Sequence, residues 1–98
     1  MGDFTKAGTD RGDLEKEVEN LLISCKMILR MYTATVEDLT KEELENDLAE
    51  YKLQWEKHIL PLVDRAKRTK RKDVVKMAEE LQETFQKLLT LIEEKLHS

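Results

Sequence analysis

The side chains that most often serve as nucleophiles, proton donors or metal ligands are scarce in this chain, whose 98 residues include two histidines, one cysteine and two serines. At the helical neighbour positions of His58 only Gln54 could act as a metal ligand, and a weak one, while His97 is next to the last residue. No group of His, Cys, Asp and Glu has the spacing of a metal site, and no glycine-rich phosphate loop occurs. We therefore predict no catalytic residue, no metal site and no cofactor, and expect that the protein is not an enzyme.

The single cysteine, Cys25, has apolar residues at its helical neighbour positions, namely Leu21, Ile28 and Leu29. Such surroundings raise the pKa of a thiol and lower its reactivity. We interpret Cys25 as a core residue rather than a nucleophile. A lone cysteine cannot form an internal disulfide, which agrees with a reducing compartment.

A second chemically distinctive feature is a run of positive charge over residues 65–72, called here the basic turn. It holds six of the 17 basic residues: Arg65, Lys67, Arg68, Lys70, Arg71 and Lys72. Without these six charges the formal net charge of −4 would be −10, so the rest of the chain is acidic. The charges either complement the C-terminal dipole of the preceding helix, or bind an acidic or phosphate-bearing partner, or form a nuclear import signal, whose spacing residues 67–70 match. Extended nucleic-acid binding is less favoured, because the run is short, contains no aromatic residue and belongs to an acidic protein.

Three stretches show the apolar periodicity of amphipathic helices, and no stretch alternates like a strand. The first predicts a helix over about 13–34, with Asp13 as its N-cap. Thr40 and Glu43 have the spacing of a capping box, which predicts that a second helix begins near Lys41. The third stretch predicts a helix over about 73–97. The apolar positions are Leu14, Val18, Leu21, Leu22, Cys25, Ile28, Leu29 and Tyr32 in the first helix, Leu44, Leu48, Tyr51, Trp55, Ile59, Leu62 and Ala66 in the second, and Val74, Ala78, Leu81, Phe85, Leu88, Leu89, Ile92 and Leu96 in the third.

Pro61 lies within the second of these helices, whose apolar positions continue through it in phase. Because proline removes a backbone hydrogen bond, we predict that helix two is kinked near Pro61, over about 57–61; the alternative is two shorter helices. Three amphipathic helices can bury their apolar faces together as an antiparallel up-down-up three-helix bundle, so the predicted fold class is all-α. In this topology the acidic residues that start the first helix, Glu15 and Glu17 among them, lie at the same end as the basic turn.

The composition, with 40% hydrophobic and 39% charged residues, suits one small helical domain. All three glycines lie within residues 1–12, which we interpret as a flexible N-terminal arm before a single domain over residues 13–98. No apolar run is long enough to cross a membrane, and the first residues lack a signal-peptide pattern. We therefore expect a soluble, intracellular protein, either cytoplasmic or nuclear, with no membrane partner.

Several apolar residues fall on the side of their helix that faces away from the predicted core. On the first helix these are Ile23, Met27 and Met31, called here the methionine stripe. Leu53 and Leu60 are similarly placed on the second helix. Methionine suits an adaptable contact surface, because its unbranched side chain repacks against different partners. The stripe is therefore either ordinary exposed surface or a docking face for a partner protein or for a second copy in a homodimer.

The second half of the chain also resembles a known family. The resemblance rests on Leu62, Val63 and Asp64 at the end of one predicted helix and on Arg71, Lys72 and Val75 at the start of the next. This pattern resembles the BAG domain, a three-helix co-chaperone module that binds the ATPase domain of heat-shock chaperones and promotes nucleotide release. The resemblance implies that Asp64 and Arg71 contact the chaperone.

These features favour a non-enzymatic helical protein–protein interaction module, of an adaptor or regulatory kind. We expect its partner to be another protein, or the same protein as a homodimer, contacted through the methionine stripe, the basic turn, or both. Two alternatives remain. One is a BAG-like nucleotide-exchange co-chaperone of heat-shock chaperones, and the other is a small nuclear factor that contacts nucleic acid through the basic turn.

Overall fold

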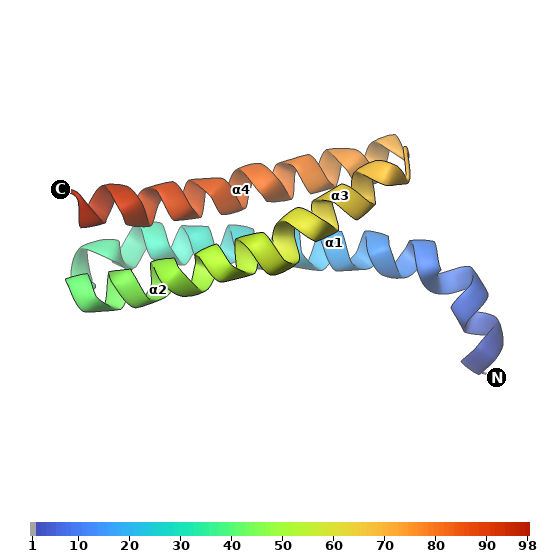
Figure 1. Cartoon of the computed structure of the whole chain (residues 1–98), viewed down its shortest axis with the longest axis horizontal. Coiled ribbons are helices and arrows are strands. Elements are labelled where there is room, and N and C mark those ends of the chain that lie inside the picture. Colours follow the sequence, from blue (N-terminus) through green and yellow to red (C-terminus); the bar gives the residue numbers. More distant parts are fainter. Residues whose placement is uncertain (1) are drawn as a thin grey trace.

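The computed structural model describes the backbone of residues 2–98 and the side chains of residues 13–98. Every regular element among the described residues is helical, so the predicted all-α class is confirmed. The elements are α1 (Gly2–Thr35), the short 3₁₀ helix η1 (Val36–Asp38), α2 (Lys41–Gln54), the π-helical segment η2 (Trp55–Ile59), α3 (Leu60–Arg68) and α4 (Lys72–Leu96). In Figure 1, α1 runs from right to left, α2 and α3 run back from left to right, and α4 runs from right to left again.

Helix α1 begins earlier than the sequence predicts. Its backbone is helical from Gly2, whereas the apolar periodicity predicts a start near residue 13. Asp13 therefore lies inside the helix and is not its N-cap. The predicted start is too late because periodicity detects only the part of a helix that has an apolar face. In Figure 1 the N-terminal end of α1 extends beyond the other helices. The side chains of the predicted arm, residues 1–12, lie outside the described residues, so the division into arm and domain stays a prediction.

Side-chain hydrogen bonds to the backbone occur near the end of α1 and at the start of α2. The Thr33 hydroxyl donates to the Leu29 carbonyl at 2.7 Å, a bond that competes with regular helix hydrogen bonding. After η1, the Thr40 hydroxyl accepts from the Glu43 N–H at 3.1 Å, while the Thr40 N–H donates to the Glu43 carboxylate at 2.9 Å. This is the predicted capping box, and α2 begins at Lys41 as expected from it.

The chain passes Pro61 by means of a π-helical turn. Pro61 has no N–H, and its ring crowds the carbonyl group four residues earlier, so a regular α-helix cannot continue undisturbed. Over η2 the turn is wider, and the Leu60 N–H bonds to the Trp55 carbonyl. Helix α3 then starts with Pro61 in its first turn, where a missing N–H costs least. The structural response to Pro61 is thus a π-helical segment directly before it.

The π-helical segment also rotates the buried face of α3 relative to that of α2. Each turn of a π-helix holds more residues than an α-helical turn, so the rotation per residue is smaller. Val63 consequently joins Leu62 and Ala66 in the core, with exposed fractions of 3, 3 and 0% respectively. Uniform α-helical periodicity predicts Leu62 and Ala66 but places Val63 outside the core.

Helix α4 supplies the centre of the core, and both other helical segments pack against it (Figure 1). Its buried apolar residues are Val74, Ala78, Leu81, Phe85, Leu88 and Ile92. Helix α1 contributes Val18, Leu22, Cys25 and Tyr32, and the segment from α2 to α3 contributes Leu44, Ile59, Leu62, Val63 and Ala66. These positions confirm most of the predicted apolar faces, to which η1 adds the buried Val36.

Four aromatic rings connect the three helical segments. Phe85 lies edge-on to Tyr51 with 6.0 Å between ring centroids and stacks on Trp55 at 5.7 Å. Tyr32 lies edge-on to Tyr51 at 6.4 Å, and its hydroxyl donates to the Asp47 carboxylate at 2.7 Å. Burial and this carboxylate raise the pKa of Tyr32, so the phenol stays neutral. Trp55 is only half-buried, so its predicted place in the core is correct only in part.

Candidate interaction surfaces

The methionine stripe lies on α1 and is exposed. Ile23, Met27 and Met31 have exposed fractions of 52, 60 and 64%, on the side of the helix opposite its buried residues. Leu53 on α2 and Leu60 on α3 are also exposed, at 53 and 37%. The prediction that these five side chains project away from the core is confirmed. Their contact with a partner stays a prediction.

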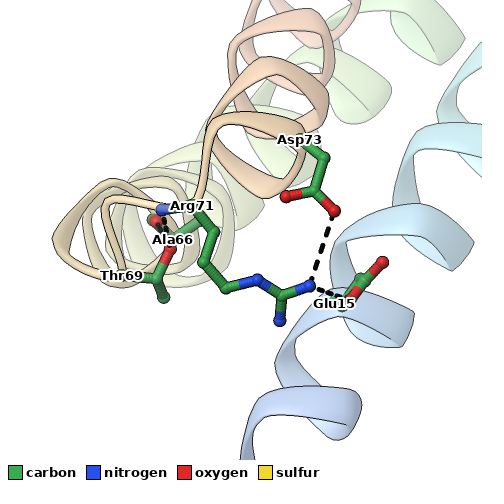
Figure 2. Close-up of polar contacts among 5 residues, drawn as sticks. All are labelled: Glu15, Ala66, Thr69, Arg71 and Asp73. Carbon is green, nitrogen blue, oxygen red and sulfur yellow. Dashed lines mark hydrogen bonds and ion pairs between the residues drawn. The ribbon is translucent and has the colours of Figure 1, made fainter.

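The basic turn is a tight connection between α3 and α4, and Thr69 shapes it. The Thr69 hydroxyl donates to the Ala66 carbonyl at 2.7 Å and accepts from the Arg71 N–H at 3.2 Å, as Figure 2 shows. Lys70 adopts a left-handed conformation with a φ of 58°, which is unfavourable for a residue with a Cβ atom. The bonds of Thr69 on either side of Lys70 hold this conformation, and the chain therefore reverses directly after α3.

The six basic side chains of the turn divide into two groups. Arg71 donates to the Glu15 carboxylate at 3.0 Å and lies 3.5 Å from the Asp73 carboxylate, which ties the turn to α1 (Figure 2). Arg68 pairs with Asp64 at 2.9 Å. Among the described side chains, no carboxylate lies within ion-pair distance of the other four, which are Arg65, Lys67, Lys70 and Lys72. The Arg71–Glu15 pair agrees with the expectation that the acidic start of the first helix lies at this end.

Asp64 and Arg71, the positions that the BAG resemblance singles out, are both paired within the chain. Asp64 holds Arg68 one helical turn away, whereas Arg71 is held by Glu15 and Asp73. A chaperone that contacted both side chains would have to replace these ion pairs. The BAG-like contact stays a prediction.

Two adjoining hollows lie between α1 and α4, with volumes of about 550 and 570 Å³. Leu29 and Thr33 of α1 line both of them, and Leu91 of α4 lines one. Their charged lining residues carry both signs, and Lys26 and Glu80 neutralise each other in an ion pair of 2.6 Å. These hollows are large enough for a ligand, but their mixed charges define no class of ligand.

The described residues contain few groups that could support catalysis. Cys25 is 4% exposed, and burial raises its pKa to about 11, so the thiol is protonated near neutral pH. His58 and His97 are exposed, and among the described residues no three or more His, Cys, Asp and Glu side chains are placed to hold a metal ion. Each buried polar side-chain atom in this part of the chain has a hydrogen-bond partner.

Comparison of the chain with protein-family models, with curated proteins and with solved structures finds no match. None of the helices in the described part of the chain has an apolar stretch of the length and hydropathy that a membrane span requires.

Proposed function

We propose that this protein is a non-enzymatic helical interaction module that binds a partner protein through the methionine stripe and the basic turn. The observation that carries the proposal is the exposure of Ile23, Met27 and Met31, each more than half exposed on a face of α1 that the core does not use. A single exposed apolar side chain is common and needs no explanation. Three on successive turns keep a continuous apolar surface in contact with water, and a partner that covered it would gain the free energy of its burial.

The proposal includes the arrangement that presents these surfaces. The domain over residues 13–98 is an up-down-up three-helix bundle whose second helix bends at η2, with the arm of residues 1–12 before it. The methionine stripe then runs along one side, and the basic turn projects at one end, where four of its side chains lack an ion pair with the described residues. The module acts in the cytoplasm or the nucleus, on another protein or on a second copy of itself.

We predict that Met27→Glu weakens partner binding or self-association by about tenfold, equal to about 1.4 kcal/mol, because Met27 is central in the stripe and interface energy concentrates at the centre. The free energy of unfolding should change by less than about 0.5 kcal/mol, since the side chain is 60% exposed. Affinity capture from a cell lysate, with the captured proteins quantified by mass spectrometry, measures partner binding. Sedimentation of the purified protein measures self-association.

The matched control is Asn46→Glu, which makes the same change of charge at an exposed position on α2. This variant should bind like the wild type. Equal binding by Met27→Glu and the wild type would show that the stripe is ordinary surface. Capture of a heat-shock chaperone that ATP releases would favour the BAG-like alternative instead, and a salt-sensitive nucleic-acid fraction would favour the nuclear factor.

For the basic turn we predict that combined Lys67→Gln, Lys70→Gln and Lys72→Gln substitution lowers partner binding by about tenfold or abolishes nuclear accumulation, because it removes three positive charges that have no ion pair among the described residues. Arg71 is left in place, since its pair with Glu15 belongs to the fold. Binding at two salt concentrations and the localisation of a fluorescent fusion are the measurements. Unchanged binding and localisation would leave the turn with a structural role only.

A further inference from the structure

A third hollow, called here the α1–α3 groove, lies between α1 and the segment that joins η2 to α3 and has a volume of about 450 Å³. Its apolar lining includes the half-buried Leu21 of α1 together with Ile59, Pro61 and Leu62. Ile59 and Leu62 are each 3% exposed, so they form the floor rather than the edge. A volume of this size accommodates one or two apolar side chains of a ligand. The groove is present without any rearrangement of the chain.

The π-helical segment forms part of the wall of the groove. Lys57, His58 and Ile59 belong to η2 and also line the groove. A π-helical turn is rare, and such turns occur frequently at functional sites because they redirect side chains that a regular helix would place elsewhere. Pro61 and the π-helical turn that accommodates it therefore lie at the same place as the hollow.

The rim of the groove is positively charged and continues into the basic turn. Lys57 and Arg65 line the groove, and neither lies within ion-pair distance of a described carboxylate. Glu17 of α1 supplies a carboxylate to the same lining. Lys67 and Lys70 follow Arg65 in the chain, at the end of α3 and in the turn after it. No ion pair crosses this groove among the described side chains, whereas Lys26 and Glu80 pair across one of the hollows between α1 and α4.

We propose that the α1–α3 groove binds a short acidic segment of a partner protein, with an apolar side chain of that segment on the floor of the groove and its carboxylates on Lys57, Arg65 and the basic turn. This inference adds the chemistry of the partner to the proposed function. It rests on the proposed function in one respect, namely that the partner is a protein. Single-stranded nucleic acid fits less well, because the floor of the groove is aliphatic and its lining contains no Phe, Tyr or Trp ring for base stacking. The apolar floor and the positive rim together match the two kinds of side chain in such a segment.

The proposal is tested by selecting random dodecapeptides, displayed on phage, against the immobilised full-length chain. We expect the enriched peptides to combine several Asp or Glu residues with at least one Leu, Ile or Phe. The most enriched peptide, synthesised with a fluorescein label, is then titrated by fluorescence polarisation. Enrichment of peptides without acidic residues, or no enrichment at all, would overturn the proposal, as would tighter binding of a labelled single-stranded oligonucleotide.

Two variants locate the binding site. Combined Lys57→Glu and Arg65→Glu substitution should weaken the selected peptide by about tenfold or more, and Asn20→Trp should do the same by filling the groove, which the exposed Asn20 lines, without a change of charge. The controls are the charge-matched pair Lys76→Glu and Lys87→Glu on α4 and the size-matched Asn46→Trp on α2, all at exposed positions. Each control should change the affinity by less than about twofold.

Each outcome decides the proposal. Loss of binding in the charge variant but not in Asn20→Trp would mean that the peptide is held by charge alone, outside the groove, and would refute the proposal. An equal loss of peptide affinity in the control variants would also refute the proposal. Melting curves of all variants test whether each one folds like the wild type. The peptide experiments could refute binding in the groove while Met27→Glu still weakens partner capture. In that case the groove proposal fails and the proposed function stands.

Discussion

Replacement of Phe85 by alanine is expected to lower the free energy of unfolding by about 4 kcal/mol, a large part of the roughly 5–15 kcal/mol that stabilises a domain of this kind. Phe85 is 5% exposed, and its ring contacts both Tyr51 and Trp55. The substitution removes the one ring that joins α4 to α2 and η2 through aromatic contacts in the described structure. Equilibrium urea denaturation followed by circular dichroism measures the change.

Conservative and peripheral substitutions calibrate this result. Phe85→Leu retains most of the apolar volume and should cost only about 1 kcal/mol. Trp55→Ala should cost about 2 kcal/mol, less than the loss of a fully buried indole, because Trp55 is half-buried. A loss below about 1 kcal/mol for Phe85→Ala would show that α4 does not form the centre of the core.

The native Cys25 thiol is expected to react with a thiol reagent at pH 8 at least about 100-fold more slowly than the thiol of the chain unfolded in urea. Burial raises its pKa from 9.0 to about 11, which lowers the thiolate fraction at this pH by about two orders of magnitude. Restricted access to a side chain that is 4% exposed slows the reaction further. The reagent is one that releases a chromophore when it reacts with a thiol. The absorbance of this chromophore, recorded with and without urea, gives the two rates. Similar rates would place Cys25 at the surface.

The same shift in pKa makes the stability of the fold depend on pH in the alkaline range. The folded state favours the neutral thiol, so this contribution is fully present below pH 9 and is lost as the pH rises through about 11. The pKa values of Tyr32 and Tyr51 are also raised by burial, which acts in the same direction. The Cys25→Ala variant should be less stable at pH 8 but should lose less of its stability between pH 9 and 11.

The amino-acid sequence alone determines the helical class, the capping box and most of the core. Apolar periodicity places Val18 and Leu22 of α1 and Leu81 of α4 correctly, and the same projection identifies Met27 as exposed. These features depend on residues within a few turns of one another. Burial of a helix requires only that apolar residues recur on one side of it, and a capping box requires only two side chains of the right type at the right spacing.

Sequence periodicity misses Val63 because it assumes the same rotation for every residue, and it also overestimates the burial of Trp55. The π-helical turn before Pro61 changes that rotation, and the burial of Val63 follows. The early start of α1 at Gly2 is missed for a related reason, since a helical stretch without an apolar face has no periodic signal.

Only the tertiary structure decides how the basic turn is divided and where the α1–α3 groove lies. Arg71 is tied to Glu15, 56 residues away in the sequence, whereas Lys67 and Lys70, in the same turn, have no such pair among the described side chains. No local pattern distinguishes these residues, because an ion pair or a groove depends on which parts of two helices come within a few ångströms of each other. That placement results from the packing of all three helical segments together, and it is therefore a property of the folded chain rather than of any segment of the sequence.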